Sequence, residues 1–599
     1  MIKQDNVYRY LSYILAVLAL FSLAVGMALW KNAGPYFYYW LAVFVLLIIG
    51  AAAAHLWHKK LKTQHFLRNS WGKEVRRDRD FSEIGSLYEL TAAGAPGDID
   101  SQTWGDLDMD QVYHKLDRTL TNPGEAVLYD ILRRPLKDGE MLLERARMLR
   151  FFQHDTAVRE KLRLTLYRLG KQDLNNITTL LWGELPARNP LRPLFTVLAL
   201  ASLFSLAAPF LWGARALFII AALFSLDMWV HYRVRRGFIY NLPAISYLGA
   251  LLRRAPQIAS LGIPGGEKYK EQLRDAAGAS RKILRQTRFL TSKVATSDVD
   301  FLLEYMKVFF LLEVRGFYAA LREIEKQRTN LQSIYLRVGE LDAFQSIASF
   351  RSELEDYSEP EFVPGGSYLN VKEARHPLLD KAVPNTIELK DQGVLITGSN
   401  MSGKSTFLKT IGVNALLAQS ICTCLAQSYV SCFFKIGASL GKSDSLAEGK
   451  SLYYMEAERL LTLVNAAGDS AFPSLCLIDE VLSGTNYIER IAAAEAILSY
   501  LAAKNALVIV ATHDLDLAQK LKDAYRCYHF TDHVGREGLY FDYILKEGLT
   551  TTRNAIKLLE QMEYPEEIVT EAATGVSQYC GKLDVGGSKP GVEIEQSPF

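Results

Sequence analysis

The N-terminal part of the chain begins with two uncharged stretches, residues 11–30 and residues 33–54. Each is about as long as the ~20-residue helix that crosses the hydrocarbon core of a bilayer. A short polar turn at residues 31–35 separates them, and aromatic residues lie at their ends, as they do at membrane interfaces. The pattern predicts a transmembrane hairpin over residues 1–60. A cleaved signal peptide is the alternative for the first stretch.

A second apolar pair, residues 194–212 and 216–230, predicts another transmembrane hairpin over residues 193–236. Its last stretch is short and contains Asp227, so a hairpin buried in a soluble core is the alternative. Basic residues flank both pairs on the side away from their turns, and the positive-inside rule then places both termini in the cytoplasm. We therefore expect a multi-pass protein of the cell (inner) membrane. The flanking cations are Lys59, Lys60, Lys62, Arg68, Arg188, Arg192, Arg233, Arg235 and Arg236.

Residues 61–192 and 237–362 carry apolar positions at helical spacing on either side of the second hairpin. In the first of these segments we expect a helix that opens near residue 122 and that Pro135 ends. Its apolar face comprises Val127, Leu128, Ile131 and Leu132. Two helical segments that flank a membrane hairpin predict a lever or stalk, and we interpret their charged faces as solvated.

Between residues 363 and 574, short apolar runs alternate with helices, which is typical of an α/β domain. Residues 393–410, GVLITGSNMSGKSTFLKT, predict a strand, a loop bounded by Gly398 and Gly403, and a helix that begins near Lys404. The order G-x-x-x-x-G-K-[ST] is that of a phosphate-binding loop. Its backbone N–H groups and helix N-terminus favour phosphates, Lys404 can reach the β- and γ-phosphates, and Ser405 can ligate Mg²⁺. The sequence therefore predicts a site for ATP or GTP.

Two further strands are predicted to end beside this loop. Residues 475–480 form an apolar strand that ends in Asp479 and Glu480, and residues 506–511 form a strand that precedes His513. Asp479 is placed to hold Mg²⁺ through water, Glu480 to polarise the attacking water, and His513 to sense the γ-phosphate. A strand that ends in two carboxylates also occurs by chance, and a lone histidine is usually structural. Ser451 opens a predicted helix at residues 452–464, either as an ordinary N-cap or as a phosphate-binding end for the nucleotide of a second chain.

Composition adds little to this picture. A net charge of +2 makes no case for nucleic acid. The six cysteines lack metal-ligand spacing, so we expect buried, reduced thiols in a cytosolic setting and no structural metal. They are Cys422, Cys424, Cys432, Cys476, Cys527 and Cys580.

Residues 104–150 and 368–573 resemble the MutS family of mismatch-repair ATPases. The resemblance is carried by LDRTLTNPGEAVLYDILRRPL, EARHPLL, LITGSNMSGKSTFLKTIGVNALLAQ, KIGASLGKSDSLAEGKSLYYMEAERL, LCLIDEVLSGTNYIERIAAAEAIL and VIVATHDLDLA. The forms N-M-x-G-K-S-T and D-E-x-x-x-G-T are specific to MutS-like proteins, and the LSGGQ-type signature of ABC transporter ATPases is absent. The expected fold is an α/β P-loop NTPase domain of the ABC/MutS type, with an α-helical lever and two transmembrane helical hairpins.

The resemblance implies a homodimer with two composite ATP sites. Asp479 and Glu480 match the family's metal-binding and catalytic carboxylates, His513 its switch histidine, and Ser451 the serine that the partner subunit offers. Tyr543 lies near the position that stacks on adenine, whereas Ala382 or Val383 replaces the family's second aromatic. Lys404, Ser405 and Thr406 match the phosphate and Mg²⁺ contacts, and Asn400 the loop asparagine. The expected loop contacts are Gly398, Ser399, Asn400, Met401, Ser402, Gly403, Lys404, Ser405 and Thr406.

The chain also departs from the family. A membrane hairpin stands where mismatch sensors carry a domain with a Phe-x-Glu wedge, the DNA-gripping clamp is missing or much reduced, and we expect no Smr nuclease tail. Residues 575–599 are rich in glycine, serine and proline and are expected to be disordered. The favoured function is a membrane-anchored dimeric ATPase that binds mismatched or structured DNA when ATP is bound. The alternatives are a membrane-tethered switch that acts on a protein partner without DNA, and a transporter that uses Asp227.

Overall fold

The computed structural model describes the chain except residues 1, 30–35, 92–96, 173–176, 188, 264–268, 275–280, 288–304, 400, 442–451, 469–470, 536–537, 550–558, 560–561, 563 and 586–599. It divides into two compact units. Unit 1 comprises Met1–Asp98, Tyr113–Arg134 and Glu140–Glu355. Unit 2 comprises Ile99–Val112, Pro135–Gly139 and Asp356–Phe599.

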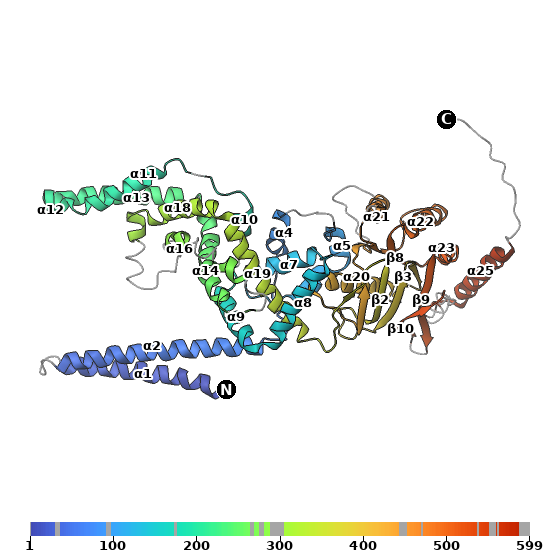
Figure 1. Cartoon of the computed structure of the whole chain (residues 1–599), viewed down its shortest axis with the longest axis horizontal. Coiled ribbons are helices and arrows are strands. Elements are labelled where there is room, and N and C mark those ends of the chain that lie inside the picture. Colours follow the sequence, from blue (N-terminus) through green and yellow to red (C-terminus); the bar gives the residue numbers. More distant parts are fainter. Residues whose placement is uncertain are drawn as a thin grey trace. The chain divides into compact units, whose positions relative to one another are not determined.

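Unit 1 begins with two long apolar helices that lie side by side (Figure 1). They are α1 (Ile2–Leu29) and α2 (Tyr36–Asn69). The spans Asn6–Ala28 and Tyr38–Asn69 are long and apolar enough to cross a membrane, and many of their large apolar side chains are exposed. The hydroxyl of Ser22 is buried between the helices and donates to the carbonyl oxygen of Trp40 at 3.1 Å. The predicted first hairpin is thus present as two long apolar helices.

The second apolar pair forms α11 (Arg192–Ser205), α12 (Ala208–Trp212), the 3-10 helix η1 (Gly213–Ala216) and α13 (Leu217–Arg235). A third candidate membrane span covers Ala208–Arg235, whereas α11 is a shorter apolar helix of 14 residues. The apolar span expected over residues 194–212 is divided between α11 and α12. Pro209 has no N–H to donate to the carbonyl of Ser205, so the helix ends at Ser205 and restarts as α12.

The rest of unit 1 is helical, and its central helix is the one predicted near residue 122. This helix, α7 (Asn122–Arg133), buries its apolar face, including the predicted Val127, Leu128, Ile131 and Leu132, and it ends before Pro135. It packs against α19 (Arg328–Arg351). The other helices are α3 (Phe81–Ile84), α4 (Ser86–Leu90), α8 (Gly139–His154), α9 (Thr156–Leu169), α10 (Ile177–Trp182), η2 (Ile239–Asn241), α14 (Leu242–Ala259), α16 (Arg281–Thr287) and α18 (Leu312–Lys326).

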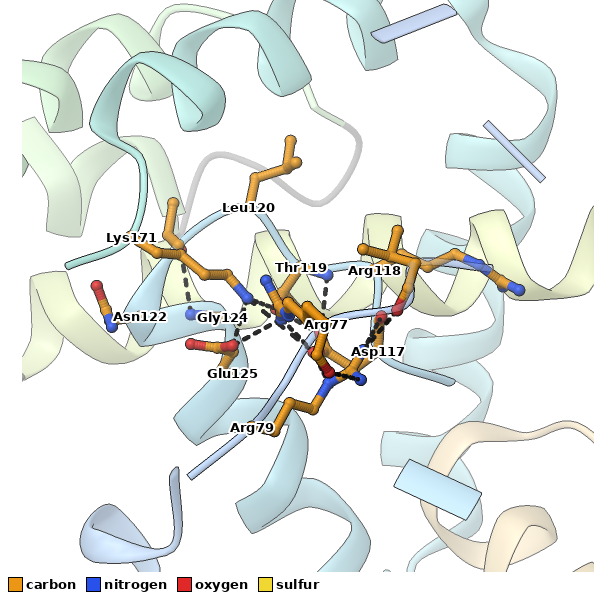
Figure 2. Close-up of polar contacts among 12 residues, drawn as sticks. Arg77, Arg79, Asp117, Arg118, Thr119, Leu120, Asn122, Gly124, Glu125 and Lys171 are labelled. Atoms are coloured by element: carbon orange, nitrogen blue, oxygen red, sulfur yellow. Dashed lines mark hydrogen bonds and ion pairs between the residues drawn. The ribbon is translucent and has the colours of Figure 1, made fainter. Parts of the chain in front are cut away.

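A buried polar network surrounds the start of α7 (Figure 2). The carboxylate of Asp117 is fully buried and forms ion pairs with Arg77 and Arg79. Glu125 on α7 forms ion pairs with Arg77 at 2.6 Å and with Lys171 at 2.5 Å. Three cations therefore share two carboxylates. The nearby cations hold the pKa of Asp117 well below its usual range, although burial opposes this shift.

Unit 2 is built on two sheets. The six-stranded sheet has the order β10-β9-β4-β8-β7-β6, in which only the β9–β10 pair is antiparallel. Its strands are β4 (Gly393–Thr397), β6 (Lys435–Ser439), β7 (Ser474–Asp479), β8 (Ala506–Ala511), β9 (Tyr525–Gly535) and β10 (Gly538–Glu547). The four-stranded sheet has the order β1-β5-β2-β3, with β1 (Glu361–Phe362), β2 (Tyr368–Ala374), β3 (Asn385–Lys390) and β5 (Ser428–Ser431). The mostly apolar β4, β7 and β8 are buried except at Asp479, as is typical of parallel strands.

The helices of unit 2 are α5 (Ser101–Asp106), the start of α6 (Met109–Leu116), α20 (Lys404–Ile421), α21 (Leu452–Gly468), α22 (Tyr487–Ala502), α23 (Leu515–Leu521) and α25 (Glu566–Val585). Because α25 runs to Val585, the prediction of disorder from residue 575 was wrong for the first part of that segment. Five of the cysteines are free thiols, of which Cys422, Cys424, Cys432 and Cys476 are buried and Cys527 is partly exposed.

Candidate functional site

Three parallel strands bring the predicted site residues to one edge of the six-stranded sheet. β8 pairs with β4 on one side and with β7 on the other, and Ala511 is in register with both Ile396 and Asp479. The carboxyl ends of parallel strands share one edge, which is where ligands bind in open α/β sheets. The loop after β4, the two carboxylates after β7 and the His513 segment after β8 therefore meet there.

The loop after β4 turns tightly because of its two predicted glycines. Gly398 has a φ of +148° and Gly403 a φ of +104°, backbone angles that residues other than glycine rarely adopt. A Cβ on Gly398 would lie 2.9 Å from the carbonyl oxygen of Phe530, so a larger residue would also collide with β9. α20 begins immediately after Gly403, and its N-terminus therefore faces the cavity at the loop.

Lys404 begins α20 and folds back over the loop. Its Nζ donates to the carbonyl oxygens of Gly398 and Ser399, both at 2.8 Å. Burial lowers the pKa of Lys404, whereas the nearby Asp479, Glu480 and Asp532 raise it. The ammonium group is thus held within the loop by neutral acceptors that a phosphate could replace.

The next side chain of α20 connects the loop to β7. The hydroxyl of Ser405 donates to Oδ2 of Asp479, the last residue of β7. A hydroxyl and a carboxylate are both oxygen ligands of the kind that Mg²⁺ prefers. In the described part of the chain, no group of three or more His, Cys, Asp or Glu side chains could hold a metal ion. A metal ion at Ser405 and Asp479 would therefore take its other ligands from phosphates and water, as Mg²⁺ does with nucleotides.

Glu480 and His513 form the second polar pair of the site. Nδ1 of His513 lies 2.7 Å from Oε1 of Glu480. The hydrogen bond to Glu480 raises the pKa of His513, and burial opposes that rise. The imidazole is 46% exposed and Glu480 only 16%, so the histidine covers the carboxylate on the side that faces solvent. This arrangement can orient a carboxylate towards a water molecule.

A cavity of about 1170 Å³ opens in front of these residues. Its polar lining includes Lys404, Ser405, Thr406, Asp479, Glu480 and His513. Its apolar and aromatic lining includes Met401, Tyr543, Leu379, Ala382 and Val383. Tyr543 is 43% exposed, and its ring lies against Gly403, where an added Cβ would come within 3.1 Å of Cδ1. The polar side chains suit phosphates, and the apolar side chains suit a planar base.

Three residues that line this cavity have strained backbone conformations. Met401, Glu480 and Tyr543 have φ between +54° and +71°, and they are three of the nine described non-glycine residues with positive φ. Such conformations cost roughly 1–3 kcal/mol each and persist where the surrounding structure holds them. Their gathering at one cavity is typical of a functional site.

The structure also brings residues to the cavity that the sequence did not predict. Arg490 on α22 lines it and forms an ion pair with Asp514 at 3.0 Å, and the hydroxyl of Ser483 donates to Glu456 at 2.5 Å. His376 and Asn385 line it as well. These side chains come from helices and loops that tertiary contacts bring together, and no local pattern marks them. Of these residues, only His376 lies in a sequence motif noted above, the His-Pro pair of EARHPLL.

Two predicted contacts, Asn400 and Ser451, lie outside the described residues. Ser399 and Ser402 belong to the described loop, where Ser402 is buried and Ser399 partly buried. The segment that ends in Ser451 leads into α21 (Leu452–Gly468), which covers the helix predicted at residues 452–464. The role of Ser451 therefore stays a prediction.

Comparison with known proteins identifies the C-terminal part. The family model of MutS domain V matches residues 394–579. The chain resembles the MutS family in this part. It is 30% identical to the DNA mismatch repair protein MutS 2 of Halobacterium salinarum over 44% of this chain and 31% of that protein. It is also 27% identical to the DNA mismatch repair protein MutS of Thermus aquaticus over 77% of this chain and 60% of that protein. It is 30% identical to the DNA mismatch repair protein MutS of Bacillus subtilis over 47% of this chain and 33% of that protein.

The alignments cover less than two thirds of the length of each of these relatives. The Thermus aquaticus alignment is longer than domain V alone, so the likeness extends into the helical part of the chain.

Proposed function

We propose that this chain is an ATPase that binds ATP with Mg²⁺ at the strand ends of the six-stranded sheet and hydrolyses it. The observation that carries this proposal is the convergence of four side chains from two separate segments on one cavity: Lys404, Ser405, Asp479 and Glu480. The match to MutS domain V supports it.

In this mechanism Lys404 exchanges its two loop carbonyl acceptors for oxygens of the β- and γ-phosphates. Ser405 and Asp479 hold Mg²⁺, which neutralises phosphate charge when bound. Glu480 accepts a hydrogen bond from the attacking water and orients it towards the γ-phosphorus. His513 fixes the position of Glu480 through their 2.7 Å contact and releases it when the γ-phosphate arrives. Tyr543 packs on the base.

Two variants test the assignment. Lys404→Met should lose nucleotide binding, and Glu480→Gln should bind ATP normally but turn over at least about 100-fold more slowly, the usual contribution of a positioned base. Lys520→Met is the matched control, because Lys520 is exposed and pairs with Glu495 away from the cavity. Wild-type turnover by Glu480→Gln would contradict the role of Glu480.

We further propose a homodimer in which Ser451 of one protomer closes on the nucleotide of the other. The match to MutS domain V supports this proposal, because it covers residues 394–579 and so includes Ser451. Glu480→Gln should accumulate as an ATP-bound dimer, measured by light scattering. Ser451→Ala should weaken that dimer without changing the fold.

We propose that the two apolar hairpins anchor the protein in the cell membrane, with both termini in the cytoplasm. The exposed apolar side chains of α1, α2 and α13 support this, since such surfaces are costly in water. A membrane-impermeant thiol reagent applied to intact cells should modify Arg215→Cys, which lies at the turn of the second hairpin, and spare Lys60→Cys. The reverse pattern would contradict the proposed orientation.

For the partner, we propose mismatched or structured DNA, on the strength of the relatives named for DNA mismatch repair. The alternative is a membrane-tethered switch that acts on a protein, favoured by the apolar hairpins. DNA binding by the purified dimer, with and without ATP and over a range of salt concentrations, separates the two. Genuine phosphate contacts weaken steeply with salt.

A further inference from the structure

α13 reverses the usual relation between polarity and burial. Its buried residues are Asp227, Val230 and His231, whereas Phe218 and Trp229 are exposed. A helix of a soluble protein buries its apolar side chains. In lipid the preference changes, because polar groups are stable only where they face another helix. The inference rests on the proposed membrane anchoring, because a helix surrounded by lipid is expected to bury its polar face.

The polar face of α13 meets a serine on α11. The hydroxyl of Ser202 lies 2.5 Å from Oδ2 of Asp227, and both side chains are fully buried. Oδ1 of Asp227 has no hydrogen-bond partner among the residues that the structure describes. A buried carboxylate with a single donor is costly, whereas a protonated carboxyl carries no charge and is well served by one hydroxyl partner. The geometry therefore suits a carboxyl group that takes up a proton.

A line of polar groups leads from Asp227 to the end of the helix. Asp227, His231 and Arg235 are spaced four residues apart and so lie on one face of α13, over about 12 Å of helix axis. Glu313 on α18 faces the last two. Its carboxylate accepts from Nε of Arg235 at 3.0 Å and lies 3.6 Å from Nε2 of His231.

Burial changes along this line in one direction. Asp227, His231 and Glu313 are all buried, and the side chain of Arg235 is 30% exposed. The line thus runs from a buried carboxyl to a group in contact with water, at the end of α13 that carries the flanking cations.

The elements packed against α13 are α11, η1 and α18. From α11, the hydroxyl of Ser202 faces the buried carboxyl, and the hydroxyl of Ser205 donates to the carbonyl oxygen of Ser202. The one charged residue of α11 is Arg192, which lies over the ring of Tyr318. η1 contributes Arg215, at the opposite end of α13. From α18, Glu313 contacts His231 and Arg235. Tyr305, in the described segment before α18, contacts Phe224.

We propose that the second apolar hairpin contains a proton-binding site at Asp227, loaded from the cytoplasmic side through Glu313 and His231. One O–H bond forms at the Asp227 carboxylate as one N–H bond of the His231 imidazolium breaks. A hydronium ion at the cytoplasmic end then protonates the Glu313 carboxylate and is left as water, and Glu313 passes that proton to the neutral His231. The ligand is a proton and not a metal ion. A carboxyl and a hydroxyl offer few of the six to eight oxygens that an ion such as Ca²⁺ takes.

Reaction with a lipophilic carbodiimide tests the site, because this reagent modifies protonated carboxyls in apolar surroundings. The full chain in nanodiscs of zwitterionic lipid is treated with dicyclohexylcarbodiimide between about pH 5 and about pH 9, the range around a histidine. Modification is located by peptide mass spectrometry. We expect modification at residue 227 that falls about tenfold per pH unit above its midpoint, as for one titrating group.

Variants give the controls. Asp227→Asn should abolish modification. If that variant does not fold, Asp227→Glu takes its place, and this variant should still be modified because it keeps a carboxyl group. Ser202→Ala should move the midpoint to higher pH, because the carboxylate loses its hydrogen-bond donor. His231→Gln should slow the response to a pH jump and leave its final extent unchanged.

Modification that does not change with pH, or none at all, overturns the proposal. Protection by Na⁺ or K⁺ at constant pH overturns it in favour of a metal-ion site. Modification of Asp227 by a water-soluble carbodiimide, with none by the lipophilic one, means that the hairpin lies in water. That last result refutes the membrane anchoring itself, and the nucleotide site is unaffected by it.

Discussion

A Cβ atom added to Gly124 would lie 2.2 Å from Oδ2 of Asp342. Gly124 is in the first turn of α7, and Asp342 is a fully buried residue of α19. The carboxylate accepts from the backbone N–H of Thr121 at 2.8 Å and from its hydroxyl at 2.6 Å. Burial raises the pKa of Asp342 to about 6, against the effect of these donors. The lack of a side chain at Gly124 is what lets α19 cap the start of α7.

Gly124→Ala should therefore destabilise unit 1. The new methyl group would push apart two buried helices, at a cost of roughly 1–3 kcal/mol, typical of an overfilled core. Thermal unfolding in detergent measures the change. Gly105→Ala is the matched control, because Gly105 also lies in a helix and an added Cβ there meets nothing within 4 Å. Equal melting temperatures for the two variants would contradict the close contact.

Asp117→Asn should be more damaging than the loss of any exposed charge. Asp117 is fully buried and pairs with Arg79, whose side chain is 2% exposed (Figure 2). Removing one partner of a buried pair leaves an uncompensated charge, at about 3–5 kcal/mol. Because the pKa of Asp117 is lowered in the folded state, its stabilising effect is present above the unfolded value near 3.8 and is lost as the pH falls. Denaturant unfolding at neutral pH measures the loss.

Glu160→Gln is the control for that measurement. Glu160 pairs with Arg68 at 2.6 Å, but 49% of the Arg68 side chain is exposed, so water already screens the pair. Exposed pairs contribute about 0–1 kcal/mol. If Asp117→Asn lost no more stability than Glu160→Gln, the buried network would not hold unit 1 together.

The sequence predicted those parts of the fold that local patterns determine. α7 has its apolar positions at helical spacing and a proline just past its end, so its face and its end were both predictable. The break at Pro209 was missed because the surrounding run is apolar throughout and hydropathy does not register a lost N–H. The bond between Asp342 and Thr121 joins residues 221 positions apart, and no local pattern contains it.

The same distinction holds at the nucleotide site. Glu480 and His513 were predicted to lie together because both follow parallel strands, and parallel strands end on one edge. Arg490 was missed because it reaches the cavity from α22, where its sequence context is that of an ordinary helix. The inverted burial of α13 also depends on packing, since the sequence shows Asp227 but not the direction in which it points.

Glu480→Gln should lower the pKa of His513. The hydrogen bond to Glu480 raises that pKa above 6.5 in the folded protein, and the amide removes the charge that does so. Diethyl pyrocarbonate modifies neutral histidine, and His513 is 46% exposed, so its modification rate against pH reports the titration. The midpoint should be above 6.5 in the wild type and closer to 6.5 in the variant. An unchanged midpoint would contradict the pairing.

That pairing also gives a pH dependence of stability. A group whose pKa is raised by folding stabilises the fold fully below its unfolded value, near 6.5, and loses that contribution as the pH rises through its folded pKa. We expect the wild type to lose a small part of its stability over this window and Glu480→Gln to lose less. Melting temperatures across the neutral range measure the difference, and a steeper loss in the variant would contradict the sign.

Tyr543→Ala should weaken nucleotide binding, and Tyr543→Phe should not. The ring lies against Gly403 in the cavity, which the small side chains of Ala382 and Val383 also line. In the proposed mode of binding this ring stacks on the base, and a stacked pair is worth about 0.5–1.5 kcal/mol. The alanine variant should therefore bind ATP up to about tenfold more weakly, with turnover at saturating ATP largely unchanged.

Titration with a fluorescent ATP analogue measures the affinity of each variant. Tripolyphosphate, which has no base, should bind both variants and the wild type equally. Weaker tripolyphosphate binding by the alanine variant would mean that Tyr543 supports the Gly403 turn and not the base.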